Sequence, residues 1–105
     1  MIVVVKSCQK EIAGLPESIR EDLADGLARL AVGLQLSMPL SRPVPSIGKG
    51  VHELRLRDRT GTYRVFYALK GRAMIYLLHA TKKTSQETPA RTIHVVEWRL
   101  EEVDR

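Results

Sequence analysis

Three short apolar runs joined at two glycines constrain the fold of this chain more than any other feature. The runs are VHELRLRD, TYRVFYALK and RAMIYLLHA, and the junctions contain Gly61 and Gly71. The runs are rich in leucine, β-branched and aromatic residues, and glycine favours the tight turns that join neighbouring strands. The pattern predicts a three-stranded antiparallel meander, with the last and most apolar run at the centre of the sheet.

The N-terminal third predicts one strand and two helical segments. Residues 1–6 are apolar and β-branched, which is typical of a short strand that is buried on both faces and pairs with a later strand. From Pro16 to Leu34, apolar residues recur at three- and four-residue spacing, which predicts an amphipathic helix with the proline in its first turn. Residues 8–15 suit a shorter helical turn before it.

The rest of the chain completes the expected architecture. Residues 38–50 contain three prolines and two glycines, which predict an irregular connector. The apolar spacing after Pro89 favours a closing helix. We therefore expect an α+β fold, with N-terminal helices packed on a small, mainly antiparallel sheet and a C-terminal helix. Chains shorter than about 150 residues seldom divide, so we expect one domain over residues 1–105.

Composition restricts the class of function. The chain has 17 Lys and Arg against 12 Asp and Glu, and this net charge of +5 favours a polyanion or an acidic partner. Cys8 is the only cysteine, so no intrachain disulfide can form and a reducing cytoplasm is the natural setting. The first apolar run is too short for a secretory signal, and no stretch approaches the ~18 apolar residues of a membrane span. We expect neither export nor membrane insertion.

Metal and cofactor chemistry have little support in the sequence. The three histidines have no spacing that resembles a metal site, and no P-loop, GxGxxG or GxSxG motif is present. We therefore expect no metal and no small-molecule cofactor. The chemistry of this chain should depend on its charged side chains.

Strand periodicity predicts a phosphate-binding region. Side chains alternate between the two faces of a strand, so Arg55 and Arg57 share one face of their run, and Arg64 lies opposite the main apolar stripe of the next run. A basic pair follows the last run. The region would contain Arg55, Arg57, Arg64, Lys82 and Lys83. The alternative is that these residues form a solvated face, or that Glu53 pairs with Arg55 or Arg64.

Four short motifs in order give the chain a family resemblance. GVHELRLRD, YRVFY, LLHATKKT and ETP resemble the phage-derived Gp49-like branch of the RelE/HigB/ParE toxin superfamily, over roughly residues 16–103. The resemblance implies a RelE-like fold and cytoplasmic expression beside a cognate antitoxin, expected to be of helix-turn-helix type. For RelE and HigB members it implies ribosome-dependent cleavage of mRNA, whereas ParE members inhibit DNA gyrase.

The resemblance also implies roles for individual residues. Arg64 corresponds to the arginine that RelE-type toxins use at the scissile phosphate. Lys82 and Lys83 correspond to a basic pair of which one member is catalytic. Further basic residues fall where the family lines its RNA path, and these are Arg55, Arg57 and Arg59.

One departure from the family leaves the general base unassigned. RelE has a tyrosine, and HigB histidine and acidic residues, in the segment where this chain has Thr88, Pro89 and Ala90. The candidate proton carriers are His52, His79 and Tyr63. Two alternatives to the nuclease stay open, namely a gyrase-inhibiting toxin and a domain that only binds an antitoxin or nucleic acid. The binding-only alternative would be favoured if Glu53 held Arg64 and no cleft existed.

Overall fold

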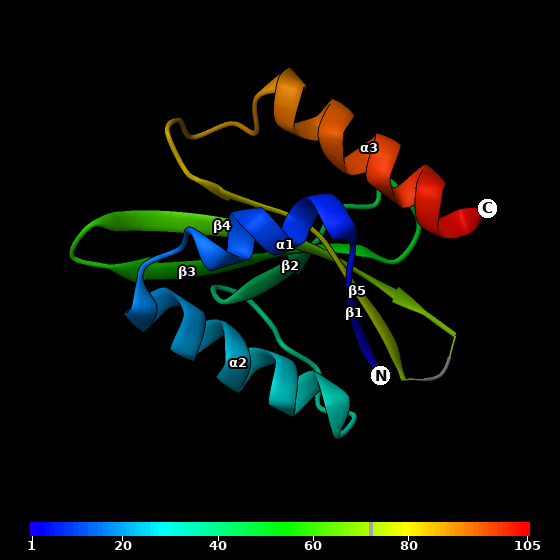
Figure 1. The fold of residues 1–105 in the computed structure, drawn as a ribbon, viewed down its shortest axis with the longest axis horizontal. Helices are drawn as coiled ribbons and strands as arrows, with labels where there is room; N and C mark the ends of the chain where they lie inside the picture. The colour runs from blue at the N-terminus through cyan, green and yellow to red at the C-terminus, as the bar shows by residue number, and fades with distance from the viewer. Residues whose placement is uncertain (72) are drawn as a thin grey trace.

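A five-stranded sheet forms the centre of the computed structural model, which describes residues 1–71 and 73–105; Arg72, in the third predicted run, lies outside them. The spatial order of the strands is β1 (Ile2–Val4), β5 (Met74–Lys82), β4 (Gly61–Lys70), β3 (Val51–Asp58) and β2 (Ser41–Pro43) (Figure 1). β1 runs parallel to β5, and the other neighbouring pairs are antiparallel. The predicted meander and the α+β class are confirmed.

Helices cover both faces of the sheet. α1 (Lys6–Ala13) and α2 (Glu17–Ala31) pack on one face, and α3 (Ala90–Asp104) packs on the other (Figure 1). The first face buries Leu54, Leu56 and Val65 beneath the two N-terminal helices. The second face buries Phe66 and Leu78 with residues of α3. The sheet therefore separates two apolar cores, and none of the helices in the described chain is long and apolar enough to cross a membrane.

The structure corrects three expectations about the strands. β1 is an edge strand with an exposed Ile2, because only β5 lies beside it, so burial on both faces was wrong. The predicted irregular connector contains β2, and its Pro43 is tolerated because β2 is the other edge of the sheet. β5 lies inside the sheet, but β4 occupies its centre, since β1 extends the sheet beyond β5.

The charged face of β3 also needs correction. By the same alternation that places Arg55 and Arg57 on one face, Val51 and Glu53 share that face, which was expected to be charged and opposite the core. Both are buried, because α3 covers the Val51 end of this face and the Glu53 end carries paired arginines. The alternation of side chains was predicted correctly, but the expected charged face is largely buried at Val51 and Glu53.

Gly50 tests the turn that leads into β3. Its φ is +79°, and a Cβ atom there would lie 2.7 Å from the Leu69 carbonyl oxygen. We expect Gly50→Ala to lower the free energy of unfolding by roughly 1–3 kcal/mol, because the backbone must move to relieve both the strain and the overlap. Urea denaturation measures the change. Gly14→Ala is the control, because a Cβ atom at Gly14 meets its nearest neighbours at 3.6 Å; an equal loss in both variants would contradict this account.

Candidate functional site

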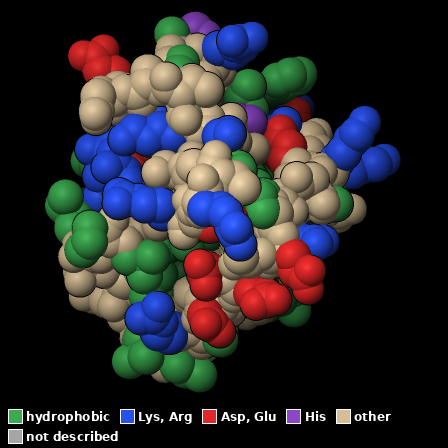
Figure 2. All heavy atoms as spheres, turned by 90° about the vertical axis from the view of Figure 1, so that its left-hand side faces the viewer, with side chains coloured by type: hydrophobic (Ala, Val, Ile, Leu, Met, Phe, Trp, Pro, Cys, Tyr) green, Lys and Arg blue, Asp and Glu red, His purple; other side chains and the backbone are tan. Residues whose placement is uncertain are grey.

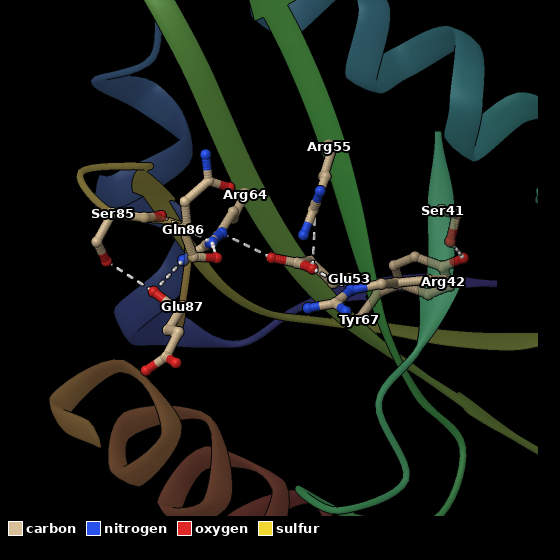
Figure 3. A network of polar contacts seen from close by, with 9 residues as sticks. All are labelled: Ser41, Arg42, Glu53, Arg55, Arg64, Tyr67, Ser85, Gln86 and Glu87. Carbon is tan, nitrogen blue, oxygen red and sulfur yellow. Dashed lines mark hydrogen bonds and ion pairs between the residues drawn. The ribbon is translucent and has the colours of Figure 1, made fainter. Parts of the chain in front are cut away.

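A buried carboxylate lies at the centre of the candidate site. Glu53 is 0% exposed and contacts three arginines, which together we call the Glu53 cluster: Glu53, Arg42, Arg55 and Arg64 (Figure 3). Glu53 Oε1 lies 2.7 Å from Arg42 Nε and 3.4 Å from Arg55 Nε. Glu53 Oε2 lies 2.7 Å from Arg64 Nε. One carboxylate faces three guanidinium groups, so the cluster retains a net positive charge.

Strand register builds this cluster. Glu53 and Arg55 are two residues apart on β3, so their side chains share a face. Arg64 on β4 stands directly opposite Arg55, and Arg42 on β2 stands directly opposite Glu53. Side chains that are opposite each other on neighbouring strands lie close enough to interact. Three strands thus bring four charged groups to one place.

The Arg64 side chain is buried in the interior of the protein. Its side chain is 1% exposed. The terminal nitrogens donate to three successive backbone carbonyls of the loop between β5 and α3, at 3.2 Å to Ser85, 3.0 Å to Gln86 and 3.4 Å to Glu87 (Figure 3). The Nε–H is not aligned for a hydrogen bond with Glu53, so charge holds that contact. Burial lowers the pKa of Arg64 from its ordinary value, against the opposing effect of Glu53.

The accessible positive charges surround this buried pair. We call the basic surface the residues Arg42, Arg55, Arg57 and Lys83, all partly or largely exposed. Partial burial, followed by the charges of Arg55 and Arg64, lowers the pKa of Lys83. Figure 2 shows Lys and Arg side chains gathered on the side of the molecule that carries the tip of the β3–β4 hairpin. Arg59 is exposed at that tip.

Three of the predicted site residues face away from Arg64. Lys82 stands opposite Tyr63, and its Nζ lies 5.9 Å from the centre of that ring. The Tyr63 hydroxyl lies 2.7 Å from Thr60 Oγ1. His52 stacks on Tyr67 at 5.2 Å, on the same face as these residues. The alternation of side chains therefore separates Lys82, Tyr63 and His52 from the basic surface.

His79 lies on the same side of the sheet as Arg64. A bulge shifts the register of β4 and β5, so that Phe66 pairs with His79 and the two rings stack at 6.4 Å. His79 Nδ1 lies 2.9 Å from Glu11 Oε1, and Arg99 donates to the same oxygen at 2.7 Å. Arg64 and His79 line one pocket of about 300 Å3, together with Thr81, Lys82, Thr84, Arg91 and Thr92. The ammonium group of Lys82 itself lies over the Tyr63 ring.

Arg42 and the partners of His79 were not predicted from the sequence. Arg42 lies in the proline-containing segment that was expected to be irregular, and a three-residue strand has too little periodicity to be recognised. Glu11 and Arg99 belong to helices that are far apart in the sequence. No local pattern could have placed them beside a histidine of β5.

Family comparison agrees with this architecture. The model of the phage-derived Gp49-like protein family matches residues 10–101. The chain belongs to the Gp49-like family. The resemblance drawn from the four sequence motifs is therefore confirmed, and a comparison with curated proteins gives no match by sequence.

Solved structures of RelE share the fold of this Gp49-like chain. An arginine-to-alanine double mutant of the E. coli toxin RelE in the free state is 14% identical, with a TM-score of 0.62, and the match covers 98% of this chain and 96% of that chain. The isolated E. coli RelE toxin in its P21 form is 15% identical, with a TM-score of 0.58 and coverage of 98% and 97%. The likeness shows that the Gp49-like chain has the RelE fold.

Arg64→Ala should destabilise the protein. A partly exposed Arg64 would contribute little to the free energy of unfolding. The structure instead buries Arg64 against Glu53. Removing one partner of a buried ion pair typically costs about 3–5 kcal/mol, because the other charge stays buried without compensation. Urea denaturation should show a loss of this size for Arg64→Ala and less than about 0.5 kcal/mol for the exposed Arg57→Ala. A small loss in both variants would mean that Arg64 is accessible in solution.

The Glu11 network should make stability depend on acid pH. Burial alone would raise the pKa of Glu11, but hydrogen bonds from Arg99, His79 and the Ala80 N–H together lower it. A lowered pKa in the folded state adds stability above the ordinary value of about 4.3, and this stability is lost as pH falls through the folded value.

Urea denaturation between pH 3 and pH 7 tests this linkage. Glu11→Gln should be less stable than the parent at pH 7, and the gap should close toward pH 3. The exposed Glu17→Gln serves as the control and should track the parent at each pH. If the difference in free energy of unfolding between Glu11→Gln and the parent does not change with pH, the lowered pKa of Glu11 is contradicted.

Proposed function

We propose that this protein is the toxin of a type II toxin–antitoxin pair and acts as a metal-independent, ribosome-dependent mRNA endoribonuclease. The observation that carries the proposal is the basic surface, which gathers Arg55, Arg57 and Lys83 on one face of the sheet. Membership of the Gp49-like family and the RelE fold support it. A cytoplasmic location and a helix-turn-helix antitoxin with an acidic surface are part of the same proposal.

The proposed reaction needs three functions from the side chains. The 2′-OH of the RNA attacks the adjacent phosphate, so one group removes its proton, another stabilises the charge on the phosphoryl oxygens, and a third protonates the leaving 5′-oxygen. Guanidinium groups suit the second function, because their planar fork can bind two phosphoryl oxygens and stays charged. We assign this function to Arg55, with Arg57 and Arg59 along the RNA path.

Proton transfer is assigned to Lys83 and His79. The lowered pKa of Lys83 makes its ammonium group a better proton donor than an isolated lysine. His79 is oriented by Glu11 and lines the pocket that Arg64 also lines. The buried Arg64 would stabilise the negative charge of the phosphate electrostatically, without direct contact. His52 and Tyr63 lie on the other face and take no part in the proposed reaction. Lys82 borders the pocket but directs its ammonium group toward the Tyr63 ring, so it takes no part either.

A binding-only role is the second candidate. This role requires that Arg64 be held by Glu53. Arg64 contacts Glu53 and donates hydrogen bonds to three loop carbonyls, so the requirement is met. The other condition, the lack of a cleft, is not met, because a pocket of about 300 Å3 lies beside Arg64 and His79. The nuclease therefore stays the first candidate.

Adjacent lysines on opposite faces provide a matched test. Primer extension on a translated and an untranslated transcript should show cuts only on the translated one, since the chain has few aromatic residues to hold unstacked bases. Lys83→Gln should lower the cleavage rate about 10²-fold or more, as expected when a proton carrier is removed. Lys82→Gln removes the same charge from a side chain that points toward Tyr63, and this variant should cleave like the parent.

The outcomes separate the candidate functions. An equal fall in cleavage rate in both lysine variants would overturn the role of Lys83. Intact transcripts with inhibited supercoiling by DNA gyrase would favour the gyrase-inhibiting alternative. Intact transcripts with normal supercoiling would favour the binding-only role.

A further inference from the structure

Arg42 and Arg55 are held in the same way by one atom. Both side chains direct their Nε toward Glu53 Oε1, at 2.7 Å and 3.4 Å, whereas Arg64 contacts the other carboxylate oxygen (Figure 3). Glu53 is 0% exposed and cannot move outward without breaking its contact with the buried Arg64. A single fixed carboxylate therefore sets the position of two surface guanidinium groups.

The side chains of these two arginines are partly open to solvent. The Arg42 side chain is 37% exposed and the Arg55 side chain is 32% exposed. Each guanidinium has five N–H donors. Within residues 1–71 and 73–105, the terminal nitrogens of Arg42 and Arg55 form no hydrogen bond with the protein. Because Nε faces inward, the two-nitrogen fork of each group is left for an external acceptor.

The strand that carries Arg42 is fixed by a side-chain contact and by a backbone hydrogen bond. Ser41 Oγ lies 2.7 Å from the buried Tyr67 hydroxyl on the opposite face. The Arg55 N–H donates to the Leu40 carbonyl at 2.8 Å. β2 is therefore tied to β3 and β4 before any ligand arrives. Because Glu53 also holds Arg42 Nε, less conformational entropy is lost when Arg42 binds a ligand.

We infer that Arg42 and Arg55 form a phosphate clamp for a single RNA strand, with Glu53 as the positioning residue. A planar fork that is held at its Nε matches the oxygens of a phosphodiester. Arg64 cannot serve as such a contact in this arrangement, because it is 1% exposed. The inference rests on the proposed function for the identity of the ligand, and it adds a residue of β2 to the RNA-binding surface.

The salt dependence of RNA binding tests the clamp. Fluorescence anisotropy with a labelled single-stranded oligouridylate gives the slope of log K against log salt, whose magnitude falls by about 0.7 for each phosphate that the protein no longer neutralises. Arg42→Gln and Arg55→Gln should each lower the slope by this amount. Arg29→Gln, on the exposed side of α2, removes the same charge outside the cluster and should keep the parent slope. An Arg42→Gln slope equal to that of Arg29→Gln would overturn the inference.

Two charge-controlled variants test the positioning by Glu53. Arg42→Lys keeps the charge but removes the fork, so the clamp predicts weaker binding and a simple charge effect predicts no change. Glu53→Gln makes the surface more positive, so charge alone predicts tighter binding, whereas loss of orientation predicts weaker binding. If Glu53→Gln does not fold, Arg42→Lys decides, and Arg42→Lys binding like the parent would overturn the clamp.

The source of the phosphate is tested separately. Inorganic phosphate at matched ionic strength should not displace the oligouridylate, because the clamp is inferred to bind a strand. Displacement would indicate a small-anion site and would overturn the assignment to RNA. If Arg42→Gln and Arg55→Gln lower the salt slope as expected but the protein cuts no mRNA on ribosomes, the nuclease proposal fails and the clamp stands. Failure of the clamp is therefore distinguishable from failure of the proposed function.

Discussion

The carboxylate of Glu53, buried among three arginines, is the interaction on which the rest of the site depends. An isolated charge in the interior would be expensive, so Glu53 is tolerated only because guanidinium groups contact both of its oxygens. These contacts come from β2, β3 and β4, so one residue links three strands that hydrogen bonds already pair. The cluster keeps an excess of positive charge, and the excess lies on the exposed arginines rather than on Arg64.

Arg64 extends this dependence to the loop before α3. Its hydrogen bonds to the carbonyls of Ser85, Gln86 and Glu87 hold the loop against the sheet. The guanidinium group is thus an internal link between sheet and loop. A residue that the family resemblance places at the scissile phosphate serves here, in the free protein, to position its neighbours.

The longer elements have local sequence signals, whereas the short strand β2 and the strand bulge do not. The meander was predicted because glycines mark its turns, and α2 was predicted from its apolar spacing after Pro16. β2 was not predicted, since a three-residue edge strand is formed by its pairing with β3 rather than by its own composition. His79 was named as a candidate, but the β4–β5 bulge that places it beside Phe66 depends on how two strands pair, which neither strand shows alone.

The sequence by itself determined the types of the main elements, the alternation of side chains along the strands, the family and the excess of positive charge. These are local properties of composition and spacing. Only the tertiary structure decided which charges are buried. The loop before α3 contacts Arg64, and three arginines surround Glu53. α3 covers the Val51 end of the same face. Burial depends on what packs against a strand, and a strand's own residues do not contain that information.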